Sequence, residues 1–163
     1  MLKYMMIDDA TSMNQFISMM GVYLRELEDD MKITDEIVQK YSTSLVNKSS
    51  PLRINELLLK DEKPIGFFAL KIDQEGDKGY TRVGECYIME LYIDQLDRRK
   101  GYGSAMFSHI CNMMRDKGVS HIYLTSLLSD STTFWIKQGF TITSEICPDN
   151  DLPILLYEIH RSI

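Results

Sequence analysis

Apolar residues recur every three or four positions in two segments near the N-terminus, which is the spacing of an amphipathic helix. Side chains that favour a helix start precede each segment: Asp9, Thr11 and Ser12 before the first, and Thr34 before the second. We therefore expect two helices, each with one buried face. These faces comprise Met13, Phe16, Ile17, Met20, Leu24 and Leu27 in the first helix, and Ile37, Val38, Tyr41 and Leu45 in the second.

Shorter apolar runs, rich in residues that favour a pleated surface, predict the strands of a sheet. They lie at residues 2–7, 54–59, 65–72, 88–93, 121–127, 140–143 and 154–159. The polar residues 61–64 predict a hairpin turn between the second and third runs. Two further helices are expected, one from Ser104 to a glycine cap at Gly118 and a short one from Ser131 to Lys137.

The remaining segments are connections. Residues 47–51 form a polar linker, and residues 73–82, which contain Gly76 and Gly79, are expected to be the most flexible part of the chain. Helices that alternate with a mostly antiparallel set of strands predict an α/β fold of the α+β kind. A chain of 163 residues suits a single domain, residues 1–163.

Composition narrows the class of protein. Hydrophobic residues make up 44% of the chain and charged residues 26%, which is typical of soluble globular proteins. Neither a run of eighteen apolar residues nor a secretory signal pattern is present, so we expect no membrane association and a cytoplasmic location. A formal net charge of -6 argues against general nucleic-acid binding and mildly favours small cationic partners.

Cysteine and histidine give little support to metal or thiol chemistry. The three cysteines are odd in number and lie in or beside apolar stretches, which favours free buried thiols: Cys86, Cys111 and Cys147. The histidines are scattered at His109, His121 and His160. Because neither set has metal-ligand spacing, no metal site is expected.

The turn after the strand at residues 88–93 reverses the acidic character of the chain. It places three cations in succession, Arg98, Arg99 and Lys100, just before the start of the next helix. Gly101 and Gly103 allow the backbone to approach a ligand closely. Because a helix start offers unpaired N–H groups and the positive end of the dipole, this turn favours an anionic group, above all a phosphate.

Two other glycine-rich loops do not fit. The P-loop needs four residues between its glycines, and the dinucleotide fingerprint needs a third glycine where Met106 stands. The pattern Arg98-x-x-Gly101-x-Gly103 instead resembles the acetyl-coenzyme A (acetyl-CoA) loop of the Gcn5-related N-acetyltransferases, the GNAT family. The segment from Phe134 to Phe140 resembles that family's second signature, Phe-Tyr-x-x-x-Gly-Phe, and the resemblance covers roughly residues 50–160.

The resemblance implies a central mixed, mostly antiparallel sheet of six or seven strands flanked by helices. It also implies transfer of an acetyl group from acetyl-CoA to a primary amine of a small molecule, peptide or protein, with a homodimer possible. Backbone N–H groups of the loop would hold the pyrophosphate, the preceding strand would pair with the pantetheine arm, and the N–H of Ile93 would face the thioester oxygen. The implied cofactor-binding residues are Leu91, Tyr92, Ile93, Arg98, Arg99, Lys100, Gly101, Tyr102, Gly103, Ser104, Ser131, Phe134 and Trp135.

Glu90 is the best candidate for the catalytic group on the amine side, because it is an acid on an otherwise apolar strand. Glu85 is the second choice. The alternative for Glu90 is a carboxylate that pairs with an arginine and has a structural role. The acceptor is expected beside the first helix pair, where the acidic residues Glu26, Glu28, Asp29 and Asp30 favour a cation.

The sequence departs from the family pattern in two places. Trp135 stands where many relatives carry the tyrosine that protonates the departing thiolate, and its indole N–H is far too weakly acidic for that role. Tyr92 and Tyr123 lie on neighbouring predicted strands and are possible replacements, although the sequence favours core packing over proton donation as the role of each. Leu128 and Ser131 stand where asparagine and alanine are common.

Two other hypotheses therefore remain open. A GNAT-like module could bind coenzyme A or a partner without turnover, which the missing tyrosine would explain. An acyltransferase that uses a cysteine nucleophile with histidine and aspartate is the third hypothesis, although nothing in the sequence places a histidine and an acid beside a cysteine.

Overall fold

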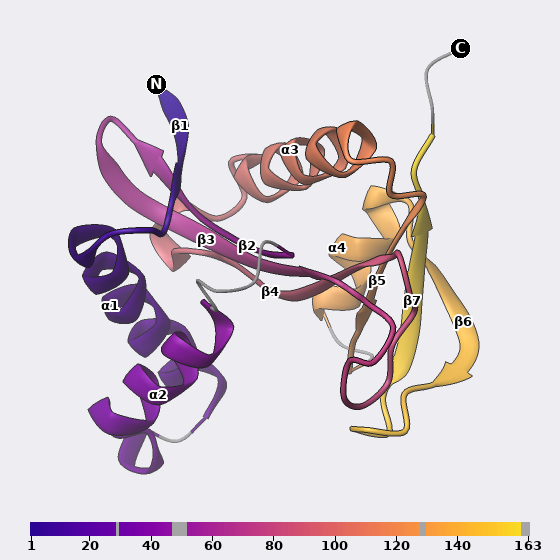
Figure 1. Ribbon diagram of the computed structural model, residues 1–163. Coiled ribbons are helices and arrows are strands. Elements are labelled where there is room, and N and C mark those ends of the chain that lie inside the picture. Colours follow the sequence, from indigo (N-terminus) through magenta and orange to yellow (C-terminus); the bar gives the residue numbers. More distant parts are fainter. Residues whose placement is uncertain (29, 47–51, 128–129, 161–163) are drawn as a thin grey trace. The chain divides into compact units, whose positions relative to one another are not determined.

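The computed structural model describes residues 1–28, 30–46, 52–127 and 130–160 (Figure 1). Within these residues, seven strands form one sheet in the order β1-β2-β3-β4-β5-β7-β6, and four α-helices accompany it. The strands are β1 (Leu2–Met6), β2 (Arg53–Lys60), β3 (Lys63–Ile72), β4 (Cys86–Ile93), β5 (His121–Thr125), β6 (Thr141–Ile146) and β7 (Pro153–Glu158). The helices are α1 (Ala10–Leu27), α2 (Asp35–Leu45), α3 (Tyr102–Asp116) and α4 (Asp130–Gln138). The predicted mixed, mostly antiparallel sheet flanked by helices is confirmed.

The chain forms two compact units. Unit 1 comprises Met1–Leu70 and Glu90–Gly103, and unit 2 comprises Lys71–Met89 and Ser104–Ile163. Strand β4 therefore begins in unit 2 and ends in unit 1, while helix α3 begins in unit 1 and continues in unit 2. The expected linker, residues 47–51, lies outside the described residues.

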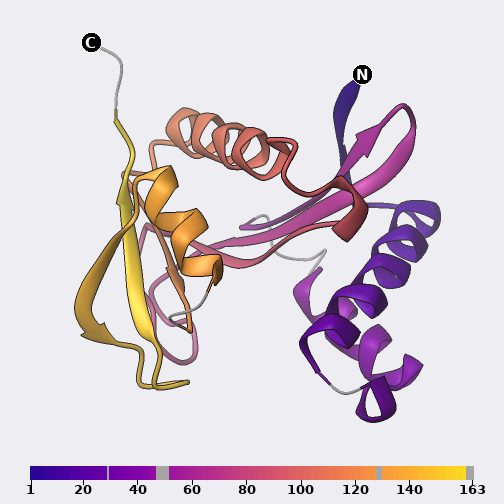
Figure 2. The same cartoon turned by 180° about the vertical axis from the view of Figure 1, so that it is seen from behind.

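Side-chain caps begin the two helices of unit 1. The Asp9 carboxylate accepts a hydrogen bond from the Ser12 N–H at 2.7 Å, and the Ser12 hydroxyl accepts one from the Asp9 N–H at 3.2 Å, so α1 starts with a reciprocal capping box. Thr34 caps α2 by accepting from the Ile37 N–H at 3.2 Å. The two helices lie alongside each other (Figures 1 and 2).

Two residues of the predicted helix faces are exposed instead of buried. Leu27 is 63% exposed because it is the last residue of α1, where the apolar stripe extends beyond the surface that it packs against. Ile37 is 45% exposed in the first turn of α2, while Val38 and Leu45 of the same predicted face are buried. Phe16 and Met20 of α1 are fully buried, as predicted.

Strands β2 and β3 supply much of the unit 1 core, and β1 extends the sheet at its edge. Strands β1 and β2 pair antiparallel, with Leu2 opposite Lys60 and Met6 opposite Glu56. The turn between β2 and β3 has positive φ at both of its residues, Asp61 and Glu62, which suits a tight hairpin. Strand β3 continues the core with an unbroken buried run from Ile65 to Leu70.

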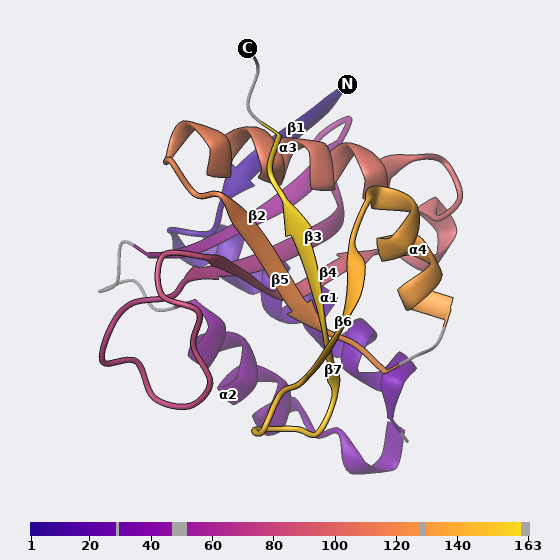
Figure 3. The same cartoon turned by 90° about the vertical axis from the view of Figure 1, so that its right-hand side faces the viewer.

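In unit 2, strand β5 has neighbours on both sides. It pairs in parallel with the start of β4, where Cys86 lies opposite Ile122, and antiparallel with β7, which in turn pairs with β6 (Figure 3). Aromatic side chains of α3, α4 and β7 fill the adjoining core. The Phe107 ring packs against Trp135, Phe140 and Tyr157, at 5.1–5.8 Å between centroids.

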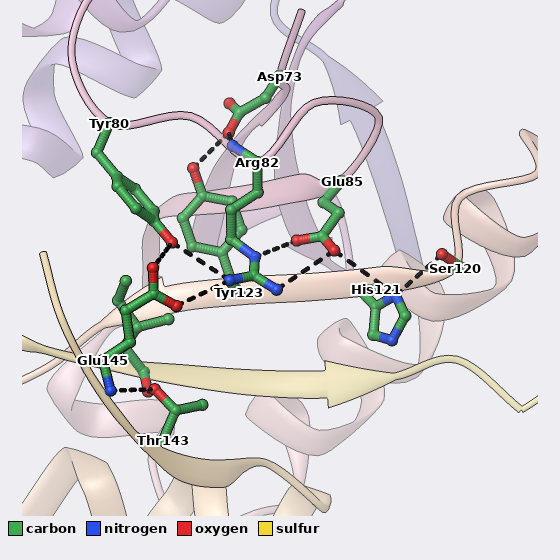
Figure 4. Close-up of polar contacts among 10 residues, drawn as sticks. Asp73, Tyr80, Arg82, Glu85, Ser120, His121, Tyr123, Thr143 and Glu145 are labelled. Atoms are coloured by element: carbon green, nitrogen blue, oxygen red, sulfur yellow. Dashed lines mark hydrogen bonds and ion pairs between the residues drawn. The ribbon is translucent and has the colours of Figure 1, made fainter.

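The segment between β3 and β4, which the sequence predicts to be flexible, is held by polar contacts (Figure 4). Asp73 accepts hydrogen bonds from the Tyr123 hydroxyl and from the Arg82 N–H. The Arg82 guanidinium bridges Glu85 and Glu145, the latter at 3.1 Å. Gly76 and Gly79 have φ of 93° and 80°, so they form turns within a tethered loop.

Candidate active site

Glu90 lies where three elements of unit 1 meet. Strand β4 supplies the carboxylate, α1 supplies Tyr23 and α2 supplies Tyr41. The Tyr23 hydroxyl donates to one carboxylate oxygen and the Tyr41 hydroxyl donates to the other, each at 2.5 Å. Burial raises the pKa of Glu90, and the two hydroxyls oppose that shift because they stabilise the ionised form.

The arginine-paired carboxylate anticipated as an alternative for Glu90 is found at Glu85 instead. Glu85 belongs to unit 2 and binds the Arg82 guanidinium, with His121 at 3.7 Å from its second oxygen (Figure 4). Its side chain is 18% exposed. This pairing gives Glu85 a role in fastening the segment between β3 and β4 and leaves Glu90 as the stronger candidate for proton transfer.

Arg98 joins the end of β4 to helix α1. Its Nε donates to the carbonyl oxygen of Ile93 at 2.8 Å, and its Nη2 donates to the Glu26 carboxylate at 2.7 Å. The guanidinium also lies over the Tyr92 ring, 5.4 Å from the centroid, and the Tyr92 hydroxyl donates to Glu26 at 2.9 Å. Arg98 thus makes three contacts within unit 1. These contacts favour a role in positioning the end of β4 and the loop over a role as a free cation that binds the cofactor phosphates.

The loop that follows Arg98 turns sharply into α3. Arg99 and Gly101 have φ of 64° and 84°, in the left-handed region. Helix α3 begins at Tyr102, two residues before the predicted start at Ser104. The first N–H groups of α3 lack acceptors within the helix, and the helix dipole is positive there.

The surroundings of this loop suit an anionic ligand. A Cβ added at Gly101 would meet no atom within 4 Å, so the space beside the backbone is open. Lys60, at the end of β2, has its Nζ 5.4 Å from the centroid of the Tyr102 ring. The Lys100 Nζ lies 3.8 Å from Oδ1 of Asp97. Donors, room and cations therefore fit the diphosphate of a coenzyme A molecule. Lys60 is an addition that the sequence motif does not include.

The other sequence-predicted cofactor residues belong to unit 2. Ser104 accepts a hydrogen bond from the Gln138 amide at 2.9 Å, Ser131 is exposed and Phe134 is half-buried. Trp135 is 8% exposed, with its ring against Phe107 and Phe140, so the indole is part of the aromatic core. Leu128 lies outside the described residues.

The two tyrosines considered as proton donors are both bound to carboxylates. Tyr92 donates to Glu26, and Tyr123 donates to Asp73. Burial first, and the neighbouring carboxylate second, raise the pKa of each hydroxyl. Both phenols are therefore weaker acids than usual and already donate to a carboxylate, so neither is suited to protonate a thiolate.

Tyr23 and Tyr41 are the functional candidates that sequence reasoning missed. Tyr41 belongs to the predicted apolar face of α2, and Tyr23 lies three and seven residues after Met20 and Phe16 of the α1 face. In the sequence, both could have been recognised as tyrosines whose polar hydroxyl lies on an otherwise apolar helix face and therefore needs a hydrogen-bond partner. The partner carboxylate could not be inferred, because it lies 49 residues from Tyr41 and 67 from Tyr23 in the chain.

Cysteine chemistry gains no support from the structure. All three cysteines are buried, and burial raises the pKa of the Cys86 thiol well above its usual range. The described residues do not bring together three or more metal-ligating side chains in an arrangement that could hold an ion. Among the same residues, no helix is both long and apolar enough to cross a membrane.

Comparison with known proteins identifies the family. The sequence model described as the acetyltransferase (GNAT) family matches residues 20–140, which is most of the chain. The chain belongs to the GNAT family. A search of curated protein sequences finds no match to this GNAT protein.

Solved structures share the GNAT fold with this protein. An acetyltransferase from Thermus thermophilus has a TM-score of 0.74 at 17% identity, and 96% of each chain is covered. The PaiA N-acetyltransferase from Thermoplasma acidophilum, in complex with coenzyme A, has a TM-score of 0.70 at 16% identity, covering 97% of this chain and 99% of that one. An aminoglycoside 6'-N-acetyltransferase complexed with coenzyme A has a TM-score of 0.72 at 12% identity, covering 100% and 99%.

Proposed function

We propose that this GNAT protein transfers the acetyl group of acetyl-CoA to a primary amine of a small molecule, peptide or protein, by direct attack in a ternary complex. The observation that supports this best is the partly buried Glu90 carboxylate, held by two hydroxyls in the same unit as the Arg98–Gly103 loop. The coenzyme A complexes of two similar structures support the choice of co-substrate.

On the cofactor side, the backbone N–H groups from Arg99 to Ser104 would bind the pyrophosphate at the start of α3. Lys60 and Lys100 would add positive charge. The backbone of Leu91, Tyr92 and Ile93 would hold the pantetheine arm, with the Ile93 N–H directed at the thioester oxygen. The bound thioester supplies an activated acetyl carbonyl carbon.

On the acceptor side, ionised Glu90 would remove one proton from the substrate ammonium. The neutral nitrogen then forms a bond to the acetyl carbon as the carbon–sulfur bond breaks, and the second nitrogen proton goes to the departing thiolate. A general base works best when its pKa lies near the working pH, and burial moves the pKa of Glu90 in that direction. Glu28 adds an exposed negative charge to this part of unit 1, whereas Glu26 is paired with Arg98, and the charge of Glu28 favours a cationic acceptor. Asp29 lies outside the described residues.

The first test of the cofactor assignment is a binding experiment. Gly103→Val places a branched side chain at the start of α3, where the phosphates would lie, and should weaken acetyl-CoA binding at least about tenfold, or about 1.4 kcal/mol. Isothermal titration calorimetry measures this loss. Ser108→Val is the matched control, because it adds the same side chain at an exposed position of the same helix. Equal affinities for the two folded variants would refute the assignment.

Turnover is tested with a panel of primary amines and a reagent that detects the released thiol. We expect activity with cationic amines, and a loss of about a hundredfold in kcat/KM for Glu90→Gln. The second candidate function, coenzyme A binding without turnover, has Trp135 at the usual tyrosine position in its favour. Tight binding of acetyl-CoA with no acetylation across the panel would favour that second function.

A further inference from the structure

The carboxylate of Glu90 is fixed from two sides by elements that are remote from it in sequence. Tyr23 reaches Oε2 from α1 and Tyr41 reaches Oε1 from α2, so each oxygen accepts one phenol proton. Three independent elements of unit 1 therefore converge on one carboxyl group. Water molecules could solvate a carboxylate without fixing its orientation. The two tyrosine hydroxyls instead fix the plane of the Glu90 carboxylate and its distance from α1 and α2.

This arrangement suits the ionised form of Glu90. An ionised carboxylate has about four acceptor sites, and two hydroxyl donors leave about one site on each oxygen for the N–H groups of a substrate ammonium. A protonated, neutral Glu90 would be a weaker acceptor for both hydroxyls, because hydrogen bonds to an ionised carboxylate are the stronger ones. The two hydroxyls therefore favour the charged state and oppose the effect of burial on the pKa.

The Tyr23 ring is itself held in place. It packs at 5.0 Å from the Tyr92 ring and at 5.9 Å from the Phe67 ring, measured between centroids. Tyr92 is fixed in turn by its hydrogen bond to Glu26, which also binds Arg98. Burial and the charges of Glu90 and Glu26 raise the pKa of Tyr23, so its hydroxyl stays protonated and remains a donor.

We propose that Tyr23 and Tyr41 are positioning residues for Glu90, which hold its carboxylate in the orientation that accepts the ammonium proton and set the pH at which it becomes ionised. This inference rests on the proposed function in its reference to an amine acceptor. The effect on ionisation depends only on contacts within unit 1. The titratable groups that contact the Glu90 carboxylate are Tyr23 of α1 and Tyr41 of α2. The next groups lie around Tyr23: its ring packs on Tyr92 of β4, whose hydroxyl binds Glu26 of α1, and Glu26 pairs with Arg98 of the loop after β4.

The test replaces each tyrosine by phenylalanine, which removes the hydroxyl and keeps the ring. Because each lost hydrogen bond stabilised the ionised carboxylate, the apparent ionisation of Glu90 should move to higher pH by about one pH unit per hydroxyl. In kinetics, the acid limb of the kcat/KM profile should move by the same amount, with about a tenfold loss of activity below the limb. Tyr4→Phe, on β1 of the same unit, is the matched control and should leave the profile unchanged.

A direct titration keeps the test independent of turnover. Carbon-13 NMR of glutamate carboxyl groups, with the Glu90 signal assigned by its absence in Glu90→Gln, reports the ionisation of Glu90 in the wild type and in both phenylalanine variants. Upward shifts in both variants support the proposal even if no amine is acetylated, in which case the proposed function fails alone. Unchanged titration of Glu90 in both variants would overturn it, as would an equal loss of activity at every pH. Either result would leave the tyrosines a purely structural role.

Discussion

Trp135 occupies the position at which a catalytic tyrosine is common in the family, and its surroundings are those of a core residue. Its ring centroid lies 5.2 Å from that of Phe140 and 5.8 Å from that of Phe107. A coenzyme A thiolate is a fairly stable leaving group, because an ordinary thiol has a pKa of about 8.5. In the proposed mechanism, protonation by the substrate nitrogen or by water can therefore be fast enough without a phenol.

Substitutions of Trp135 distinguish a packing role of this residue from a catalytic one. Trp135→Phe should cost about 1–2 kcal/mol of stability through lost core volume, while kcat stays within about threefold of the wild type. Urea unfolding and steady-state kinetics measure the two effects. Trp135→Tyr should raise kcat if its new hydroxyl reaches the sulfur. A thousandfold loss of kcat in Trp135→Phe with acetyl-CoA binding intact would contradict the packing role and reveal a chemical one.

At the same scale, residues that act locally were predictable and residues that act at a distance were not. Asp9 and Thr34 cap helices through N–H groups three residues away, so their role is visible in a short window of sequence. The partnership of Glu90 with Tyr23 and Tyr41 depends on the packing of two helices on a strand. Sequence reasoning selected Glu90 from its acidity on an apolar strand, and could not supply the donors that tune it.

Among the elements, the segment between β3 and β4 depends on one buried carboxylate. The Asp73 side chain is 0% exposed and accepts from the Tyr123 hydroxyl and, at 2.8 Å, from the Arg82 N–H. The Lys71 ammonium lies 3.5 Å from its other oxygen. Removal of this carboxylate would leave a buried hydroxyl and a backbone N–H without their acceptor, and the largely buried Lys71 ammonium would lose one of its two carboxylate partners.

Asp73→Ala should therefore reduce the free energy of unfolding by about 3 kcal/mol. Asp73→Asn should cost less, because an amide oxygen still accepts hydrogen bonds. Asp77→Ala is the matched control: Asp77 also pairs with Lys71, at 3.4 Å, but its side chain is 32% exposed, so the loss should stay below about 1 kcal/mol. Urea unfolding at neutral pH measures all three. A cost for Asp73→Ala no larger than that for Asp77→Ala would show that the buried network contributes little.

The accuracy of the sequence prediction differs between elements according to how their side chains are buried. Strands with continuous apolar runs, such as β3, were located within two residues because burial on both faces leaves an unmistakable pattern. Strand β6 extends to Ile146, beyond the predicted 140–143, because most of its side chains are exposed and give no alternation to read. The polar, glycine-containing segment 73–82 predicted flexibility, since the partners that tether it, Glu145 and Asp149, come from the far end of the chain.

At the scale of the whole molecule, two short signatures were sufficient for the fold. The first lies in a turn from a strand into a helix and the second runs from a helix into a strand, and few architectures share both. The order β1-β2-β3-β4-β5-β7-β6 required the structure, since strand pairing depends on long-range contacts that a single sequence does not display. The net charge of -6, by contrast, can be read completely from the sequence. Its consequence concerns the rate at which charged reactants meet the protein.

An acidic protein attracts cationic acceptors and repels anionic ones over distances that salt shortens. Raising the ionic strength from about 0.01 M to about 0.15 M reduces the Debye length from about 30 Å to about 8 Å, so long-range attraction is largely lost. With acetyl-CoA saturating, kcat/KM for a diamine should fall about threefold or more, and that for a monoamine of similar size should fall less.

Glu28→Gln removes one exposed negative charge at the C-terminal end of α1 and should make kcat/KM for the diamine less dependent on ionic strength. Two different neutral salts at equal ionic strength control for specific ion effects. If diamine and monoamine respond equally, or if kcat/KM rises with salt, the acidic surface does not guide the acceptor, and selection of the amine then rests on contacts at Glu90 alone.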